Sequence, residues 1–114
     1  MELEIETIRM GNVVIVAVNG EVDTTTVGSL QAVFDDLVTR GEQNYVIDLS
    51  QVAFMDSSGL AALTKLYKRI RIGRGDVRLC HLRPEMRRIM ELTRLDRVFE
   101  IYDDRQAAIA SFTQ

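Results

Sequence analysis

The sequence predicts an α/β domain whose β-sheet is mostly parallel. Apolar, strand-like stretches alternate with stretches whose apolar residues recur at helical spacing, an order typical of parallel sheets. A turn signal close to the N-terminus adds one antiparallel pair of strands. The 114 residues fit a single domain, expected to span residues 1–114, and their balance of 46% hydrophobic and 27% charged residues suits a globular chain.

The N-terminal part of the chain is predicted to form a β-hairpin. Charged and apolar residues alternate over residues 3–9, and Gly11-Asn12 supplies the turn. Residues 13–18 are almost continuously apolar, which predicts a central strand buried on both faces. The segment Asn19-Gly20-Glu21-Val22-Asp23 then breaks the apolar run, and a connecting loop is expected there.

Helices and further strands alternate over the rest of the chain. About four helices are predicted, at residues 27–38, 60–70, 84–90 and 107–112. Three more short strands are predicted, at residues 45–49, 77–82 and 98–102. Thr24–Thr26 are candidate N-caps of the first helix, Pro84 suits the first turn of the third, and Asp103 or Asp104 is expected to cap the last.

Two polar loops follow strands of the predicted sheet. Because functional sites of open parallel sheets form at the carboxyl ends of the strands, loops 20–23 and 54–59 are expected at the same edge. The second loop contains Asp56, Ser57 and Ser58 directly before a predicted helix, and the first ends at Asp23. We therefore expect a surface patch on which the two aspartates and the two serines lie close together.

The Asp-Ser-Ser segment has three interpretations. It is a helix N-cap, a nucleophilic serine with His81 as its base, or a serine that another enzyme modifies. The nucleophile is disfavoured because the G-x-S-x-G turn of hydrolases is missing. Two acids and one histidine lack metal-ligand spacing, and no phosphate-binding loop is found, so no metal or cofactor is predicted.

Charge distribution and cysteine content limit which partners the protein is expected to bind and which cellular compartment it is expected to occupy. Residues 1–56 carry a net charge of −8 and residues 57–114 a net charge of +5. This asymmetry indicates either solvated helices that simply differ in charge, which is the commoner case, or a charged partner surface. The basic residues are scattered without interleaved aromatics, so nucleic acid is not expected to bind. The single cysteine, Cys80, suits a reducing compartment. No signal peptide or membrane-length apolar run is found, and a cytoplasmic location is expected.

Residues 46–60, which read VIDLSQVAFMDSSGL, resemble the signature of bacterial anti-sigma factor antagonists in the STAS-domain family. The segment Gly20-Glu21-Val22-Asp23 resembles the family's loop after the second strand. Residues 91–99 resemble the end of its third helix, and residues 107–112 resemble its last helix. The resemblance covers nearly the whole chain and implies a single STAS-like domain.

The resemblance implies a non-enzymatic, partner-switching phosphoprotein that regulates transcription. Unmodified members of the family bind an anti-sigma factor, which is itself a serine kinase of the GHKL type, and thereby release a sigma factor that they affect only indirectly. The kinase phosphorylates the antagonist and is released, and a PP2C-type phosphatase restores the unmodified form. The acceptor position corresponds to Ser57, with Ser58 as the second candidate. The implied partner-binding residues are Asp23, Asp56, Ser57, Ser58, Gly59 and Leu60.

Other functions stay open for a domain of this family. One is a scaffold or regulatory module that is never phosphorylated, and another is a domain that binds a small molecule or nucleotide at the strand ends. An enzyme using Ser57 or Ser58 would show an activity by itself, and Ser57→Ala would abolish it. A phosphorylation switch would instead retain partner binding in that variant.

Overall fold

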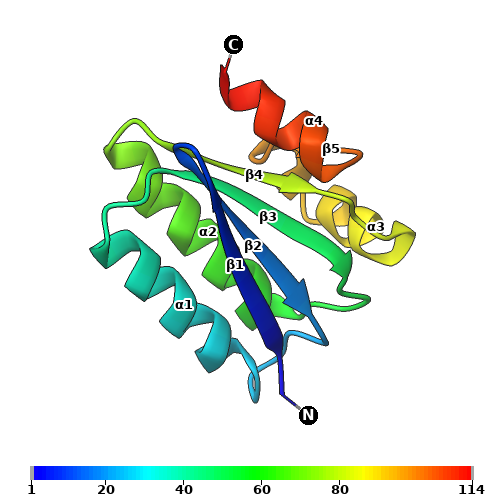
Figure 1. Cartoon of the computed structure of the whole chain (residues 1–114). Coiled ribbons are helices and arrows are strands. Elements are labelled where there is room, and N and C mark those ends of the chain that lie inside the picture. The colour runs from blue at the N-terminus through cyan, green and yellow to red at the C-terminus, as the bar shows by residue number, and fades with distance from the viewer. Residues whose placement is uncertain (1, 114) are drawn as a thin grey trace.

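The computed structural model describes residues 2–113, and Figure 1 shows a sheet flanked by helices. Five strands and four helices are found in this part of the chain, together with two short 3-10 segments at Leu95–Arg97 and Ser111–Thr113. The strands are β1 (Glu4–Met10), β2 (Val13–Asn19), β3 (Asn44–Gln51), β4 (Asp76–Cys80) and β5 (Ile101–Tyr102). The helices are α1 (Val27–Thr39), α2 (Ser57–Ile72), α3 (Pro84–Leu92) and α4 (Arg105–Ala110).

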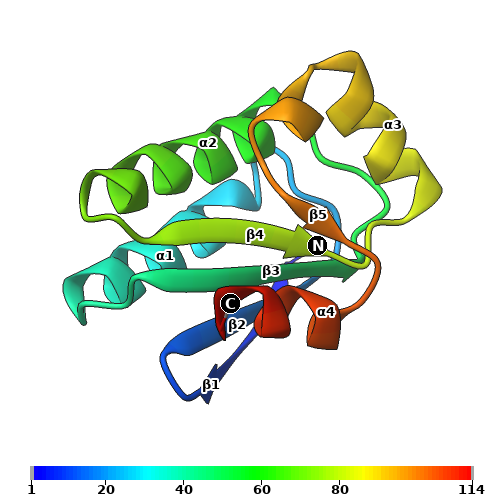
Figure 2. The ribbon, with the colours of Figure 1, turned by 90° about the horizontal axis from the view of Figure 1, so that it is seen from above.

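The strands lie in the order in which they occur along the chain, β1-β2-β3-β4-β5. The β1–β2 pair is antiparallel, and the other three pairs are parallel. This arrangement confirms the α/β class, the mixed sheet and the N-terminal hairpin. Seen from above in Figure 2, α1, α2 and α3 lie on one side of the sheet and α4 lies on the other.

Two hydrophobic clusters fill the two sides of the sheet. On β2, Val14, Val16 and Val18 face the large cluster beneath α1, α2 and α3. Val13 and Ile15 face a smaller cluster that includes Ala108 of α4. The alternation confirms that this strand is buried on both faces, and it explains the unbroken apolar run of residues 13–18.

The C-terminal strands are shorter than predicted. β4 ends at Cys80 rather than Leu82, because the next residue, His81, has a left-handed backbone with φ +60°. The strand predicted over residues 98–102 is reduced to Ile101–Tyr102. Its first residues belong to a tight turn instead, in which the backbone N–H of Phe99 donates to the carbonyl of Leu95 at 3.0 Å.

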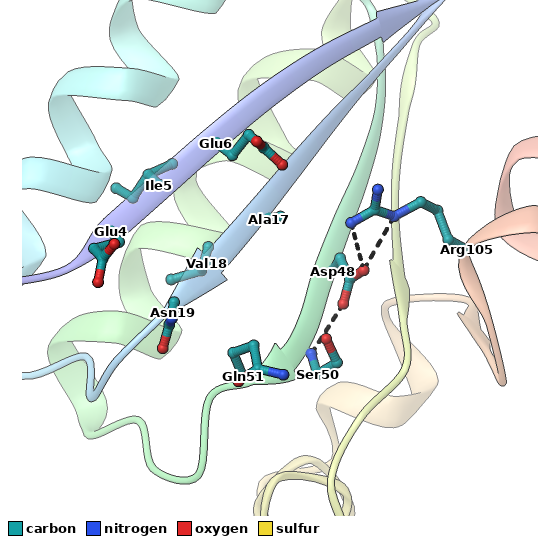
Figure 3. A pocket seen from close by; sticks show the side chains of 10 residues that line it. All are labelled: Glu4, Ile5, Glu6, Ala17, Val18, Asn19, Asp48, Ser50, Gln51 and Arg105. Carbon is teal, nitrogen blue, oxygen red and sulfur yellow. Dashed lines mark hydrogen bonds and ion pairs between the residues drawn. The ribbon is translucent and has the colours of Figure 1, made fainter.

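A buried ion pair ties α4 to the sheet. Asp48 on β3 has only 6% of its side chain exposed, and its Oδ2 accepts hydrogen bonds from Nε and Nη2 of Arg105 at 3.1 and 2.9 Å. Its Oδ1 accepts the backbone N–H of Ser50 at 2.9 Å. Burial by itself raises the pKa of Asp48, but the Ser50 and Arg105 contacts outweigh it and the net pKa is lowered. Figure 3 shows this pair as one wall of a groove over β1, β2 and β3.

Replacing Arg105 by Met should destabilise the domain in a pH-dependent way. Because Asp48 stays buried without its partner, we expect the free energy of unfolding at neutral pH to fall by roughly 1–3 kcal/mol, below the value for a fully buried pair since Arg105 is partly exposed. The folded-state pKa of Asp48 is lowered in the wild type and will rise in the variant. The destabilisation should therefore shrink as the pH falls toward 4 and below, where both proteins bind the proton.

Denaturant titrations between pH 3 and pH 7 measure this difference. Arg40→Met is the matched control, because Arg40 pairs with Asp36 on the solvent-exposed side of the molecule and should contribute about 0.5 kcal/mol or less. A destabilisation by Arg105→Met that is equal at every pH would contradict the proposed electrostatic origin.

The hydroxyl of Tyr45 is buried without a hydrogen-bond partner among the described residues. The residue is completely buried, and burial is the main cause that raises its pKa to about 12. A buried, unsatisfied polar group costs on the order of 1–3 kcal/mol. Tyr45→Phe should therefore leave the thermal midpoint unchanged or raise it. A clear fall in the midpoint would show that the hydroxyl has a stabilising partner.

Candidate functional site

The loops after β2 and β3 run side by side at the carboxyl edge of the sheet (Figure 1). An isolated parallel bridge pairs Val22 with Met55 beyond the ends of the two strands. The backbone N–H of Val22 donates to the carbonyl of Phe54 at 3.1 Å, and the N–H of Asp56 donates to the carbonyl of Val22 at 3.0 Å. These bonds confirm the expected meeting of the two loops.

Asp56 is the N-cap of α2, as the sequence suggested. Its Oδ1 accepts the backbone N–H groups of Ser58 and Gly59, at 2.9 and 3.2 Å, and the Ser58 hydroxyl at 2.5 Å. The Ser58 hydroxyl is the main cause that lowers the pKa of Asp56, and the nearby charge of Asp23 works in the opposite direction. The aspartate is therefore a firmly ionised cap that occupies the free N–H groups at the start of the helix.

Asp23 holds the neighbouring loop in the same manner. Its Oδ1 accepts the backbone N–H groups of Thr25 and Thr26 at 2.9 and 3.2 Å, and the Thr25 hydroxyl at 2.6 Å. These bonds lower the pKa of Asp23, with the Thr25 hydroxyl as the largest cause. The sequence placed the N-cap of α1 among Thr24–Thr26, and Thr26 does occupy that position, but its side chain makes no capping bond. The Thr26 hydroxyl instead donates to the carbonyl of Glu21 at 2.8 Å.

Ser57 and Ser58 differ sharply in environment. Ser58 is partly buried and its hydroxyl is engaged by Asp56, whereas Ser57 is exposed as the first residue of α2. Within residues 2–113 the Ser57 hydroxyl makes no hydrogen bond that would hold it in place. Of the two serines, Ser57 is therefore the one that presents a free hydroxyl, next to the Asp56 carboxylate.

Gly59 and Leu60 line the inner side of the site. Gly59 is buried, and a Cβ added to it would lie 2.2 Å from Cγ of Met55 and 2.8 Å from Cγ1 of Val22. A glycine is therefore needed at position 59 because α2 packs so closely against the paired loops that a side chain there would clash. Leu60 is partly buried and packs against the main core, which leaves part of its side chain accessible.

The arrangement does not support nucleophilic catalysis by either serine. Asp56 contacts Ser58, but a carboxylate with a lowered pKa is a poor general base. His81 is exposed just beyond the end of β4, and its backbone N–H donates to the carbonyl of Tyr102 at 3.0 Å. Within residues 2–113 no group of three or more His, Cys, Asp or Glu side chains is arranged to hold a metal ion.

The threonines of the first loop and Phe54 were not predicted as site residues. Thr25 completes the Asp23 hydrogen-bond network, and Phe54, next to the Val22–Met55 bridge, is 46% exposed. A signal for the threonines was present, since Asp-Thr-Thr at 23–25 matches Asp-Ser-Ser at 56–58 in chemistry and spacing. The exposure of Phe54 had no such signal, because aromatic residues beside a strand are usually buried.

Known proteins share both the sequence pattern and the fold. The model of the STAS domain family matches residues 4–108. The anti-sigma F factor antagonist of Paenibacillus polymyxa is 31% identical over 110 residues, which cover 96% of this chain and 94% of that protein. An anti-sigma-B factor antagonist of Staphylococcus aureus is 28% identical over 95 residues, with 83% and 88% coverage. The crystal structure of an anti-sigma factor antagonist from Mycobacterium paratuberculosis superposes with a TM-score of 0.91 at 28% identity, covering 98% of this chain and 95% of that one.

The fold and the paired loops define a small α/β domain with a capped, serine-bearing helix at the sheet edge. The chain belongs to the STAS domain family. None of the described helices combines the length and the apolar character that a membrane crossing requires.

Gly59→Ala should destabilise the domain. Gly28→Ala, at the other helical glycine, serves as the control and should have the opposite effect on stability. The added methyl group at position 59 collides with Met55 and Val22, and overpacking of this kind costs roughly 1–3 kcal/mol. At Gly28 in α1 a Cβ meets nothing within 4 Å, so Gly28→Ala should stabilise by about 0.5–1 kcal/mol through helix propensity. Chemical denaturation measures both, and equal effects of the two variants would contradict the packing role of Gly59.

Proposed function

We propose that this protein is an anti-sigma factor antagonist whose partner binding is switched off by phosphorylation of Ser57. The observation that carries the proposal is the exposed, unengaged Ser57 hydroxyl, held next to the fixed Asp56 carboxylate in a STAS-family chain. The names of the relatives from Paenibacillus polymyxa and Staphylococcus aureus support the antagonist role. The protein acts by binding and carries out no catalysis of its own.

The proposed partners are two proteins with opposite effects on Ser57. The unmodified face binds an anti-sigma factor of the GHKL serine-kinase type, so a sigma factor is released without touching this chain. The kinase then phosphorylates Ser57, and a PP2C-type phosphatase reverses the modification. The proposed contact residues are Asp23, Asp56, Ser57, Ser58, Gly59 and Leu60.

Charge provides the physical basis of the switch. A phosphate brings roughly −1.5 to −2 charges at neutral pH. The free N–H groups at a helix N-terminus normally bind and stabilise such an anion. Here, however, Asp56 already accepts the N–H groups of Ser58 and Gly59. The phosphate on Ser57 would therefore remain at the surface, close to Asp56 and within a patch that also contains Asp23. A partner that fits the unmodified patch would meet a face with about twice its negative charge.

Ser57 is favoured over Ser58 as the acceptor because of hydrogen bonding. A kinase needs a hydroxyl that can turn toward the phosphoryl donor, and the Ser57 hydroxyl is free to do so. The Ser58 hydroxyl is bound to Asp56 at 2.5 Å and lies partly buried, so its modification would break the cap of α2. Ser58 would act instead by holding Asp56 ionised.

A nucleotide-binding function finds little support in the groove over β1, β2 and β3, on the side of the sheet that carries α4. This groove has a volume of about 360 Å³, and the Asp48–Arg105 pair forms one of its walls (Figure 3). Glu4 and Glu6 lie on the opposite wall, and its one cation, Arg105, already pairs with Asp48. Nucleotide phosphates would meet a net negative lining, which disfavours their binding.

Substitutions of Ser57 should show whether this residue is a phosphorylation switch or has only a structural role. Ser57→Asp should fold normally yet weaken binding to the cognate anti-sigma factor by about tenfold or more, because it places a like charge in the interface. Ser57→Ala should bind as the unmodified wild type does and should no longer respond to the kinase. Calorimetry with the purified partner measures both affinities, and equal affinities of Ser57→Asp and wild type would argue against the electrostatic switch.

A further inference from the structure

We infer that the exposed face of α2 binds the groove over β1, β2 and β3 of a second copy of this chain, so that copies associate head to tail. The two surfaces lie on opposite sides of the sheet, because α2 packs on one side (Figure 2) and the groove opens on the side that carries α4 (Figure 3). One copy therefore cannot fill its own groove. Phosphorylation of Ser57 is not needed for this contact.

The exposed face of α2 is cationic and partly apolar. Residues 57–75 contain five lysine or arginine residues and no acidic residue. The exposed stripe of the helix, with spacings of four, three and four residues, consists of Ala61, Lys65, Lys68 and Ile72. These residues line a hollow of about 400 Å³, and Ile72 is 87% exposed. The face thus combines two ammonium groups with apolar surface.

The acidic residues beside α2 do not neutralise its two lysines. Asp35 of α1 binds Arg69 at 2.6 Å, and Asp76 binds Arg78 at 2.9 Å. Among the described residues, Lys65 and Lys68 take part in no ion pair. Their charge is therefore available to a surface outside the chain that carries carboxylates.

The groove has the opposite charge and lies on a part of the sheet that no helix covers. Its lining holds the carboxylates of Glu4, Glu6 and Asp48. The one cation there, Arg105, is already bound by Asp48 at 2.9 Å. Glu4 and Glu6 are exposed, and within residues 2–113 neither makes an ion pair. Helix α4 has only six residues and packs mainly against β3, β4 and β5, which leaves the groove open.

The charges on the two surfaces have similar spacing. Glu4 and Glu6 are alternate residues of β1, so their side chains point to the same face about 7 Å apart. Lys65 and Lys68 are three residues apart on α2, which places their Cβ atoms about 5–6 Å apart. Each ammonium group can therefore reach one carboxylate. The chain supplies both surfaces at equal concentration, which favours a second copy over a different basic partner for the groove.

The contact joins two different surfaces of the same chain, so every assembly leaves one groove and one α2 face free. Copies would add one at a time, and the average mass would rise continuously with concentration instead of stopping at a dimer. Because exposed ion pairs are weak and are screened by salt, the association should be weak and should be lost at high ionic strength.

Sedimentation equilibrium of the full chain tests this contact, at about 20 mM and about 0.5 M salt. At low salt the average mass of the wild type should rise with concentration, and at high salt it should equal that of the monomer. Reversal of the groove charges by Glu4→Lys with Glu6→Lys should lower the association constant about tenfold or more. Reversal of the helix charges by Lys65→Glu with Lys68→Glu should have the same effect.

Two further variants separate local pairing from net charge. Glu91→Lys with Asp96→Lys changes the net charge as much as the groove reversal does, at exposed positions outside both surfaces, and should associate as the wild type does. The chain that carries the groove and helix reversals together has the wild-type net charge of −3. It should associate again, because its groove is then basic and its helix face acidic.

Three outcomes contradict the inferred contact. A wild type that stays monomeric at low salt, up to the highest attainable concentration, would show that the two surfaces do not bind each other. Association that survives both reversals would assign it to a different surface. A combined variant that stays monomeric while folded, as judged by circular dichroism, would exclude the pairing of groove and helix. The wild-type result does not depend on the folding of any variant, and the switch at Ser57 is tested separately by binding to the anti-sigma factor.

Discussion

The backbone pairing of Val22 with Met55 is the constraint on which the site depends. β2 and β3 end at Asn19 and Gln51, yet their chains stay hydrogen-bonded through Gly20 and on to the bridge. Without this extension the two loops would be free to separate, and the aspartates would have no fixed relation. With it, the hydrogen-bond networks of Asp23 and Asp56 both start from the same short piece of parallel pairing. Backbone hydrogen bonds thereby fix the relative positions of two segments that are distant in the sequence.

The same constraint explains the packing around α2. The helix must start directly above the paired loops if its N-terminus is to present Ser57 at the sheet edge. Gly59 permits that approach, because any side chain there would occupy the space of Met55 and Val22. The site and the core consequently share residues, and Met55 serves the bridge, the glycine contact and the hydrophobic cluster together.

Periodicity and strand order sufficed to predict the sheet class, the helices and the convergence of the two loops, since each of these follows from local pattern and parallel topology. The pattern could not show that Phe99 turns into the core and contacts Tyr67 at 5.1 Å between ring centroids, which shortens β5. It also could not pair Asp48 with Arg105, 57 residues apart. Nor could it distinguish Ser57 from Ser58, because that difference depends on which hydroxyl reaches Asp56.

The preformed hydrogen-bond networks of Asp23 and Asp56 favour a switch that works by charge and not by refolding. Asp23 and Asp56 have lowered pKa values and each already holds two backbone N–H groups through Oδ1, so a phosphate on Ser57 would not need those N–H groups. In the proposed switch the fold would keep the same structure in both states, and the electrostatic potential above the patch would be what changes. The partner, rather than a refolded loop, would then sense the modification.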